Sequence, residues 1–123
     1  MSVRIEERQL GEVVIVDLYG KVTDGDSAIH DTVKSLTSQG VRHVVLNFAA
    51  VSYIDSVGLS TLVRAHLALR QHGGALALLH VPRQIAATLT ATRLTSIIQT
   101  FDDESVAIHG VQAAKSPITP SRS

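Results

Sequence analysis

A continuous apolar segment, Ala75 to Val81, constrains the fold of this chain more than any other feature of its sequence. The segment reads ALALLHV and follows directly on Gly73 and Gly74. A strand with one solvated face would alternate polar and apolar residues, so this run predicts a central strand buried on both faces. Such strands are typical of parallel sheets, which carry helices on both sides.

Strand-like and helix-like segments alternate along the rest of the chain. Strands are predicted at 3–9, 12–20, 41–48, 75–81 and 96–101, and helices at 26–40, 56–72, from 82, and at about 103–111. The first two strands meet at the short stretch Leu10-Gly11-Glu12, which predicts a hairpin. This order predicts a single α/β domain: a mostly parallel sheet of four to five strands, an N-terminal β-hairpin and about four helices.

The ends of the domain follow from the same patterns. We expect the domain to occupy residues 1–112. Residues 113–123 read AAKSPITPSRS, with two prolines, three serines and no apolar periodicity, and they predict a flexible tail.

Composition excludes several classes of function. The chain has 11 basic and 11 acidic residues, so no global field attracts nucleic acid or an anionic membrane. It has no cysteine and no His-Glu-x-x-His pattern among its six histidines, so no cofactor or metal site is expected. Its first ten residues are too charged for a signal peptide, and its apolar runs are too short to span a bilayer. We therefore expect a cytoplasmic protein that neither inserts into membranes nor binds nucleic acid.

The junction between the strand that begins at Val41 and the next helix holds Asp55, Ser56 and Gly58. One interpretation is that Ser56 caps the helix, because serine is a preferred N-cap residue. The other is that its hydroxyl is phosphorylated, because free N–H groups and the helix dipole favour a negative group there. Asp55 would oppose the phosphate by like charge, whereas Gly58 would leave room for another protein's active site. Spacing alone favours the cap.

A serine hydrolase is an alternative from another class. The triplet Gly25-Asp26-Ser27 could supply a nucleophile, as could Ser56, but each would need a histidine oriented by an acid. No Gly-x-Ser-x-Gly motif occurs, and the triplet precedes a helical pattern that it could simply cap. We therefore expect no enzymatic activity.

The stretch VSYIDSVGLSTLVRAH, residues 51–66, resembles the STAS domains, and more closely the bacterial anti-sigma factor antagonists. It is preceded by VRHVVLNFAA and followed by GGALALLHVPRQIAATLTATRLTSIIQTFDDESVAI, which match in order and spacing. The resemblance covers residues 3–111, and its most specific part is the Asp-Ser-x-Gly-Leu core from Asp55 to Leu59.

The resemblance implies a phosphorylation switch. In such proteins an anti-sigma factor with serine kinase activity phosphorylates the serine at the Ser56 position, and a PP2C-type phosphatase removes the phosphate. The unmodified form sequesters the anti-sigma factor and so frees a sigma factor. The resemblance assigns partner binding to Asp55, Ser56, Gly58 and Leu59. In this assignment Asp55 orders the loop, and Gly58 and Leu59 start the helix.

The segment from Lys21 to Ser27 departs from the family pattern. Many members have an acidic turn such as Gly-Glu-Leu-Asp after the second strand, whereas this chain has GKVTDGDSA. Asp24 is the candidate substitute for that acid in partner binding, and its loop is expected near the Ser56 edge of the sheet. The departure keeps a second interpretation open, a non-switching STAS subunit of a signalling scaffold or lipid-transport complex.

Overall fold

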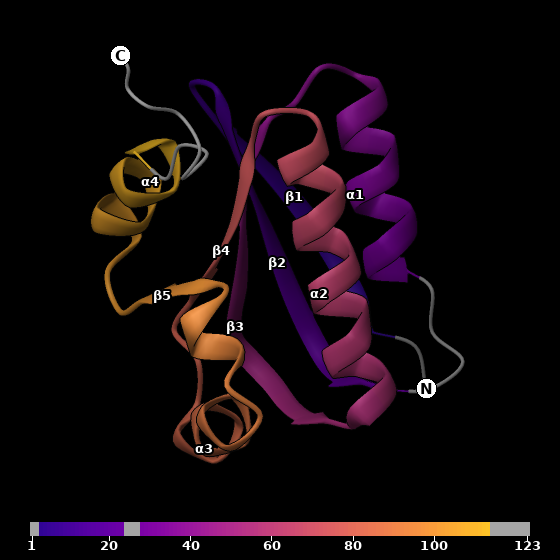
Figure 1. Ribbon diagram of the computed structural model, residues 1–123, viewed down its shortest axis with the longest axis vertical. Helices are drawn as coiled ribbons and strands as arrows, with labels where there is room; N and C mark the ends of the chain where they lie inside the picture. Colours follow the sequence, from indigo (N-terminus) through magenta and orange to yellow (C-terminus); the bar gives the residue numbers. More distant parts are fainter. Residues whose placement is uncertain (1–2, 24–27, 114–123) are drawn as a thin grey trace.

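The computed structural model describes residues 3–23 and 28–113, which form a five-stranded sheet with helices on both faces (Figure 1). The elements are β1 (Arg4–Leu10), β2 (Val13–Val22), α1 (Ala28–Ser38), β3 (His43–Ile54), α2 (Ser56–Gln71), β4 (Ala75–Leu79), α3 (Arg83–Ala91), the 3₁₀ turn η1 (Leu94–Ser96), β5 (Gln99–Phe101) and α4 (Glu104–Ala113). The strand order is β1-β2-β3-β4-β5, with β1 antiparallel to β2 and the other pairs parallel. The predicted fold class, a single mostly parallel α/β domain, is confirmed.

The N-terminal hairpin is also confirmed. Leu10 pairs with Val13 across a two-residue turn made of Gly11 and Glu12. Gly11 has a φ of 65°, a left-handed conformation that glycine adopts without the steric cost of a Cβ.

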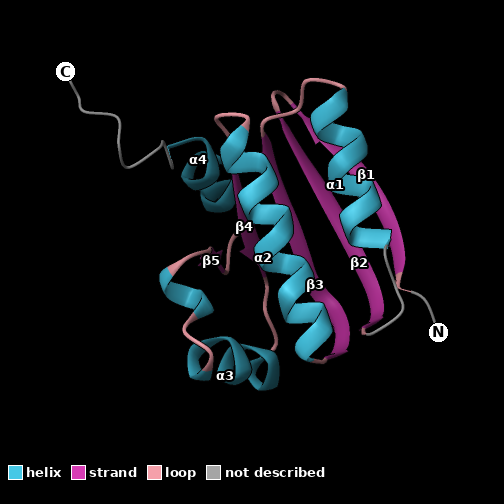
Figure 2. Cartoon of the chain, turned by 45° about the vertical axis from the view of Figure 1, so that its right-hand side comes forward, coloured by secondary structure: helices cyan, strands magenta, loops and turns pink. Residues whose placement is uncertain are grey.

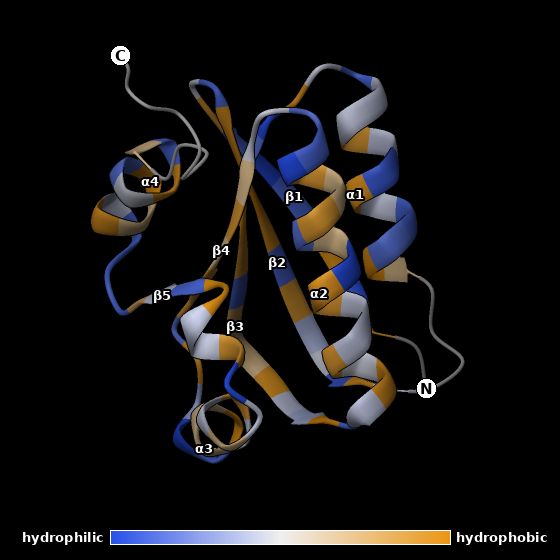
Figure 3. Ribbon diagram, viewed as in Figure 1, coloured by the Kyte–Doolittle hydropathy of each residue, from blue (hydrophilic) through white to orange (hydrophobic). Residues whose placement is uncertain are grey.

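Two apolar clusters, one on each face of the sheet, explain the continuous apolar runs. Figure 2 shows α1 and α2 on one side of the strands and α4 on the other. In β2, Val14 and Val16 belong to the larger cluster, which includes buried residues of α1, α2 and α3. Their neighbours Val13 and Ile15 belong to the smaller cluster, with Ala107 from α4. Figure 3 shows the resulting apolar band through the central strands.

The predicted central strand is confirmed as β4. It lies between β3 and β5, and all five of its residues are buried. It ends at Leu79, before the predicted Val81. The next residue, His80, is exposed and has a φ of 54°, which turns the chain out of the sheet.

The predicted end of the third strand, Phe48, is wrong. Strand β3 continues to Ile54, and its register against β2 shifts in two places. After Phe48 the buried residues recur every third position, at Val51 and Ile54, instead of every second. An extra residue in a strand breaks the two-residue period in this way. The residues turned outward are Ala49, Ala50, Ser52 and Tyr53.

A buried carboxylate joins β1, β2, β3 and α4. Arg8 donates hydrogen bonds to both oxygens of Asp17, at 2.7 and 3.0 Å, and one to Glu104 at 2.8 Å. Asn47 donates to Asp17 at 2.8 Å and accepts from the backbone N–H of Ala49 at 3.0 Å, next to the irregular part of β3. Burial alone would raise the pKa of Asp17, but the hydrogen bonds from Arg8 and Asn47 and the charge of Arg8 outweigh it and lower that pKa.

The last helix differs slightly from its predicted range. Asp103 lies just before α4, and its carboxylate accepts a hydrogen bond from the backbone N–H of Val106 at 3.0 Å. This contact is typical of a residue that caps a helix, so the helix begins one residue later than predicted. Ala113, predicted as the first tail residue, ends α4. Residues 114–123 lie outside the described part of the chain, and the flexible tail stays a prediction.

Candidate functional site

Ser56 is the first residue of α2, and Asp55 is the N-cap of that helix. Asp55 has extended backbone angles, φ −107° and ψ −176°, and its side-chain Oδ1 accepts the N–H of Gly58 at 2.8 Å. Its carbonyl accepts the N–H of Leu59 at 2.9 Å. The interpretation of Ser56 as the cap is therefore wrong, because the preceding carboxylate already holds that position.

The side chain of Ser56 is exposed, as expected for a modification site. Within residues 3–23 and 28–113, its hydroxyl makes no hydrogen bond, while its carbonyl accepts the hydroxyl of Ser60 at 3.2 Å. The helix N-terminus supplies a positive partial charge beside the hydroxyl, and the first turn of α2 contains no acidic residue. A negatively charged group added to this hydroxyl would therefore break no hydrogen bond within the described part of the chain.

Replacing Asp55 with Ala should lower the free energy of unfolding by about 1 kcal/mol, because the cap is lost. Asp55→Asn keeps a side-chain oxygen that can accept from Gly58 and should lose much less. Ser56→Ala should stay close to wild type. Urea unfolding of the three variants measures these differences. A loss in Ser56→Ala as large as that in Asp55→Ala would return the capping role to Ser56.

Gly58 is buried, and its position is explained by packing. A Cβ there would lie 2.4 Å from the carbonyl oxygen of Val22 and 2.8 Å from Cγ1 of Ile54. The same carbonyl accepts the N–H of Asp55 at 3.2 Å, so the end of β2 holds the start of α2 directly. We expected a glycine here because it would leave room for a partner. The structure explains it instead by the close approach of Gly58 to Val22 and Ile54.

The other residues assigned to partner binding differ in exposure. Asp55 and Leu59 are half-buried, and Leu59 packs against the larger apolar cluster. Asp24 lies outside the described residues, as do Asp26 and Ser27. Among the residues that the resemblance assigned and the structure describes, Ser56 is therefore the one with an exposed side chain.

Two exposed apolar side chains near Ser56 were missed by the sequence reasoning. Tyr53 is 51% exposed and Val57 is 41% exposed. Beside Tyr53 is a hollow of about 210 Å³ between the end of β3 and α3, lined by Ser52, Tyr53, Ile54, Gln84, Ile85 and Thr88. Strict alternation in β3 could not have revealed this surface, because the irregular register turns both Ser52 and Tyr53 outward.

His66 is buried on α2. Its Nδ1 has no hydrogen-bond partner among the described residues. Burial, and then the nearby charge of Arg70, lower the pKa of His66, so the neutral ring is favoured. Among the described residues, no group of three or more His, Cys, Asp or Glu side chains could hold a metal ion. None of the helices in that part of the chain is long and apolar enough to cross a membrane.

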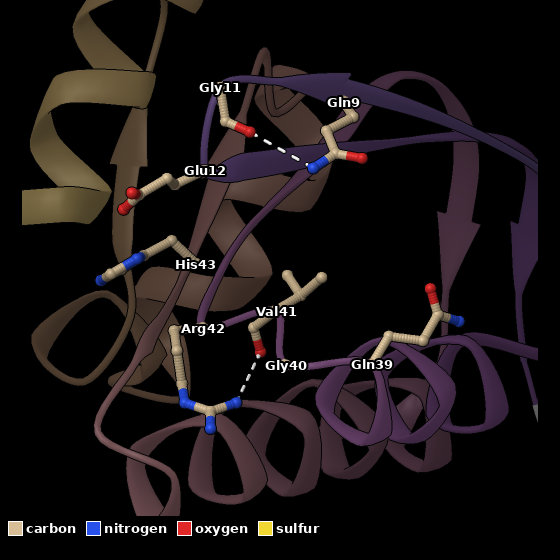
Figure 4. A pocket seen from close by; sticks show the side chains of 8 residues that line it. All are labelled: Gln9, Gly11, Glu12, Gln39, Gly40, Val41, Arg42 and His43. Atoms are coloured by element: carbon tan, nitrogen blue, oxygen red, sulfur yellow. Dashed lines mark hydrogen bonds between the residues drawn. The ribbon is translucent and has the colours of Figure 1, made fainter.

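A larger hollow of about 450 Å³ lies at the other end of the sheet, where β2 and β3 begin (Figure 4). It is lined by Gln9, Gly11, Glu12, Gln39, Gly40, Val41, Arg42 and His43. The side chain of Gln9 donates to the carbonyl of Gly11 at 3.3 Å, and Arg42 donates to that of Val41 at 3.4 Å. It shares no lining residue with the hollow beside Tyr53.

Comparison with known proteins shows the same fold. The STAS domain family model matches residues 4–107. An anti-sigma factor antagonist from Mycobacterium paratuberculosis is 16% identical, with a TM-score of 0.77 and coverage of 89% of this chain and 93% of its own. The Bacillus cell fate determinant SpoIIAA in its phosphorylated form is 19% identical, with a TM-score of 0.66 and coverage of 88% and 99%. A sulfate transporter family protein from Wolinella succinogenes is 17% identical, with a TM-score of 0.69 and coverage of 85% and 88%.

Proposed function

Because this chain belongs to the STAS domain family, we propose that it is an anti-sigma factor antagonist whose binding is switched by phosphorylation of Ser56. In the unmodified form it sequesters an anti-sigma factor with serine kinase activity and so frees a sigma factor. That kinase phosphorylates Ser56 and is released, and a PP2C-type phosphatase restores the binding form. We therefore expect the protein in the cytoplasm, with the sigma factor that it controls.

One observation carries this proposal: Ser56 has an exposed hydroxyl at a helix N-terminus, while Asp55 performs the capping. A hydroxyl that capped the helix could not be modified without loss of a hydrogen bond. Here a phosphate would gain from the helix dipole and leave the Asp55 cap in place. Two relatives with this fold are anti-sigma factor antagonists, and one of them, SpoIIAA, has been solved in a phosphorylated form.

The proposal is tested by incubating the protein with ATP and a candidate anti-sigma factor kinase encoded in the same genome. Mass spectrometry should find one phosphate, on Ser56, and none in Ser56→Ala. Ser60→Ala is the matched control, because it removes an exposed hydroxyl close to Ser56, and it should be modified as wild type is. Phosphate on Ser52 or Ser60 instead would contradict the assignment.

A non-switching STAS subunit is the second candidate, since a sulfate transporter family protein has the same fold. In that case a partner would bind wild type, Ser56→Ala and Ser56→Asp equally, and no kinase would modify Ser56.

We also propose that the chain has no catalytic activity of its own. The support is that the Ser56 hydroxyl has no histidine hydrogen-bonded to it among the described residues. Ester hydrolysis that disappears in Ser56→Ala or Ser27→Ala would favour the hydrolase alternative instead.

A further inference from the structure

We propose that the hollow beside Tyr53 receives an uncharged, apolar side chain of the same partner that binds around Ser56, with Tyr53 as the anchor of that contact. This inference rests on the proposed function, and it names a second element, α3, as part of the partner's binding surface.

The irregular register of β3 presents Tyr53 to solvent. The buried residues Val51 and Ile54 are three apart, so Ser52 and Tyr53 both point away from the larger apolar cluster. The chain has only four aromatic residues, two Tyr and two Phe. Phe48 is fully buried, and Tyr19 and Phe101 are half-buried, which leaves Tyr53 as the exposed one. Exposed tyrosines of this kind are enriched among the residues that contribute most to protein interfaces.

The size of the hollow fits one side chain better than a metabolite. Its volume of about 210 Å³ is below the roughly 300–1,000 Å³ of typical small-molecule pockets. A single side chain that protrudes from a protein surface needs less room than a whole ligand. The lining residues Ser52, Tyr53 and Gln84 are exposed, so such a side chain can enter the hollow from outside.

The chemistry of the lining favours an apolar occupant. None of the six lining residues carries a charge at neutral pH. The hydroxyl of Ser52 donates to the carbonyl of Gly20 at 3.4 Å, and that of Thr88 donates to the carbonyl of Gln84 at 3.3 Å. These two hydroxyls already have acceptors inside the protein, so an apolar group can cover them without leaving a hydrogen bond unmade. The other two polar side chains of the lining, those of Tyr53 and Gln84, are exposed, so their polar ends can stay in water.

Two residues that line the hollow come just before Ser56 in the chain. Tyr53 and Ile54 stand three and two residues before Ser56, on the strand that runs directly into α2, and the exposed Val57 follows it. A protein that brings an active site to the Ser56 hydroxyl therefore covers this strand end as well. The occupant is thus a side chain of the kinase partner.

Three variants test the inference. Tyr53→Ala removes the anchor, and Thr88→Arg fills the hollow with a long charged side chain. Val106→Ala is the matched control, because Val106 is 54% exposed and lies on α4, against the opposite face of the sheet. Calorimetric titration of the unphosphorylated proteins with the anti-sigma factor should show at least tenfold weaker binding for the first two variants and unchanged binding for the control. Circular dichroism and thermal melts identify a variant that fails to fold, in which case the other variant decides.

The possible failures can be told apart. If wild type neither binds the anti-sigma factor nor is phosphorylated at Ser56, the proposed function fails, and this inference fails with it. If wild type binds and both folded variants bind equally well, this inference is overturned and the proposed function stands. If sedimentation shows a wild-type dimer that Tyr53→Ala dissociates, the occupant is a second copy, and the inference is again overturned.

Discussion

Replacing Ser56 with Asp should weaken binding of the anti-sigma factor by thirtyfold to several thousandfold, with a melting temperature close to that of wild type. The fold should tolerate the charge because the side chain is exposed and lies at the N-terminus of α2. The helix dipole favours a negative charge there by about 0.3–1 kcal/mol, and repulsion from Asp55 acts against it.

The interface should not tolerate the same charge. Tyr53 and Val57 provide exposed apolar surface near Ser56, so a partner that packs on them removes water from the new carboxylate. Leaving such a charge buried and unpaired costs about 2–5 kcal/mol at interfaces, which gives the stated loss of affinity. A phosphate, with a charge of about −1.5 to −2, should act in the same direction and more strongly.

Calorimetry with the partner measures this effect. Ser56→Ala should bind as wild type does and resist modification. Ser60→Asp adds the same charge one helical turn away, at another exposed position, and should weaken binding less. Equal affinities for wild type, Ser56→Ala and Ser56→Asp would show that the charge at Ser56 plays no part in binding.

Replacing Gly58 with Ala should lower the free energy of unfolding by about 1–3 kcal/mol, the usual cost of an extra group in a well-packed site. In most helices this substitution has the opposite sign, because Ala is favoured over Gly by up to about 1 kcal/mol. Here the new Cβ would lie 2.4 Å from the backbone oxygen of Val22. Backbone cannot rotate aside as a side chain does, so α2 must shift away from the end of β2.

Thermal or urea unfolding measures this loss, and Ser60→Ala is its matched control. Ser60 lies on the exposed face of the same helix, so its replacement should change the free energy of unfolding by less than about 0.5 kcal/mol. A Gly58→Ala protein as stable as wild type would mean that α2 can move from β2 without cost. The contact with Val22 would then not hold the Ser56 site in place.

Patterns local to the sequence were sufficient for much of the fold. The unbroken apolar run at Ala75–Leu79 identified the inner strand β4, and the short spacing around Gly11 identified the hairpin. The change from strand-like to helical period at Asp55 and Ser56 located the start of α2 to the residue. These features depend on which face of a strand or helix is buried. The spacing of apolar residues within one segment indicates that face.

Other features depend on segments that are distant in sequence. The register shifts that extend β3 and expose Tyr53 arise from its pairing with β2, and the need for Gly58 arises from contact with Val22. The hydrogen bond between Arg8 and Glu104 joins residues 96 positions apart. No periodicity within one segment encodes such contacts, because their geometry exists only after the strands have paired and the helices have packed on them. The choice between Asp55 and Ser56 as the cap of α2 also depends on a distant segment. Both residue types are good N-caps, so the sequence leaves the choice open. In the structure the N–H of Asp55 donates to the Val22 carbonyl, Asp55 caps the helix and Ser56 faces solvent.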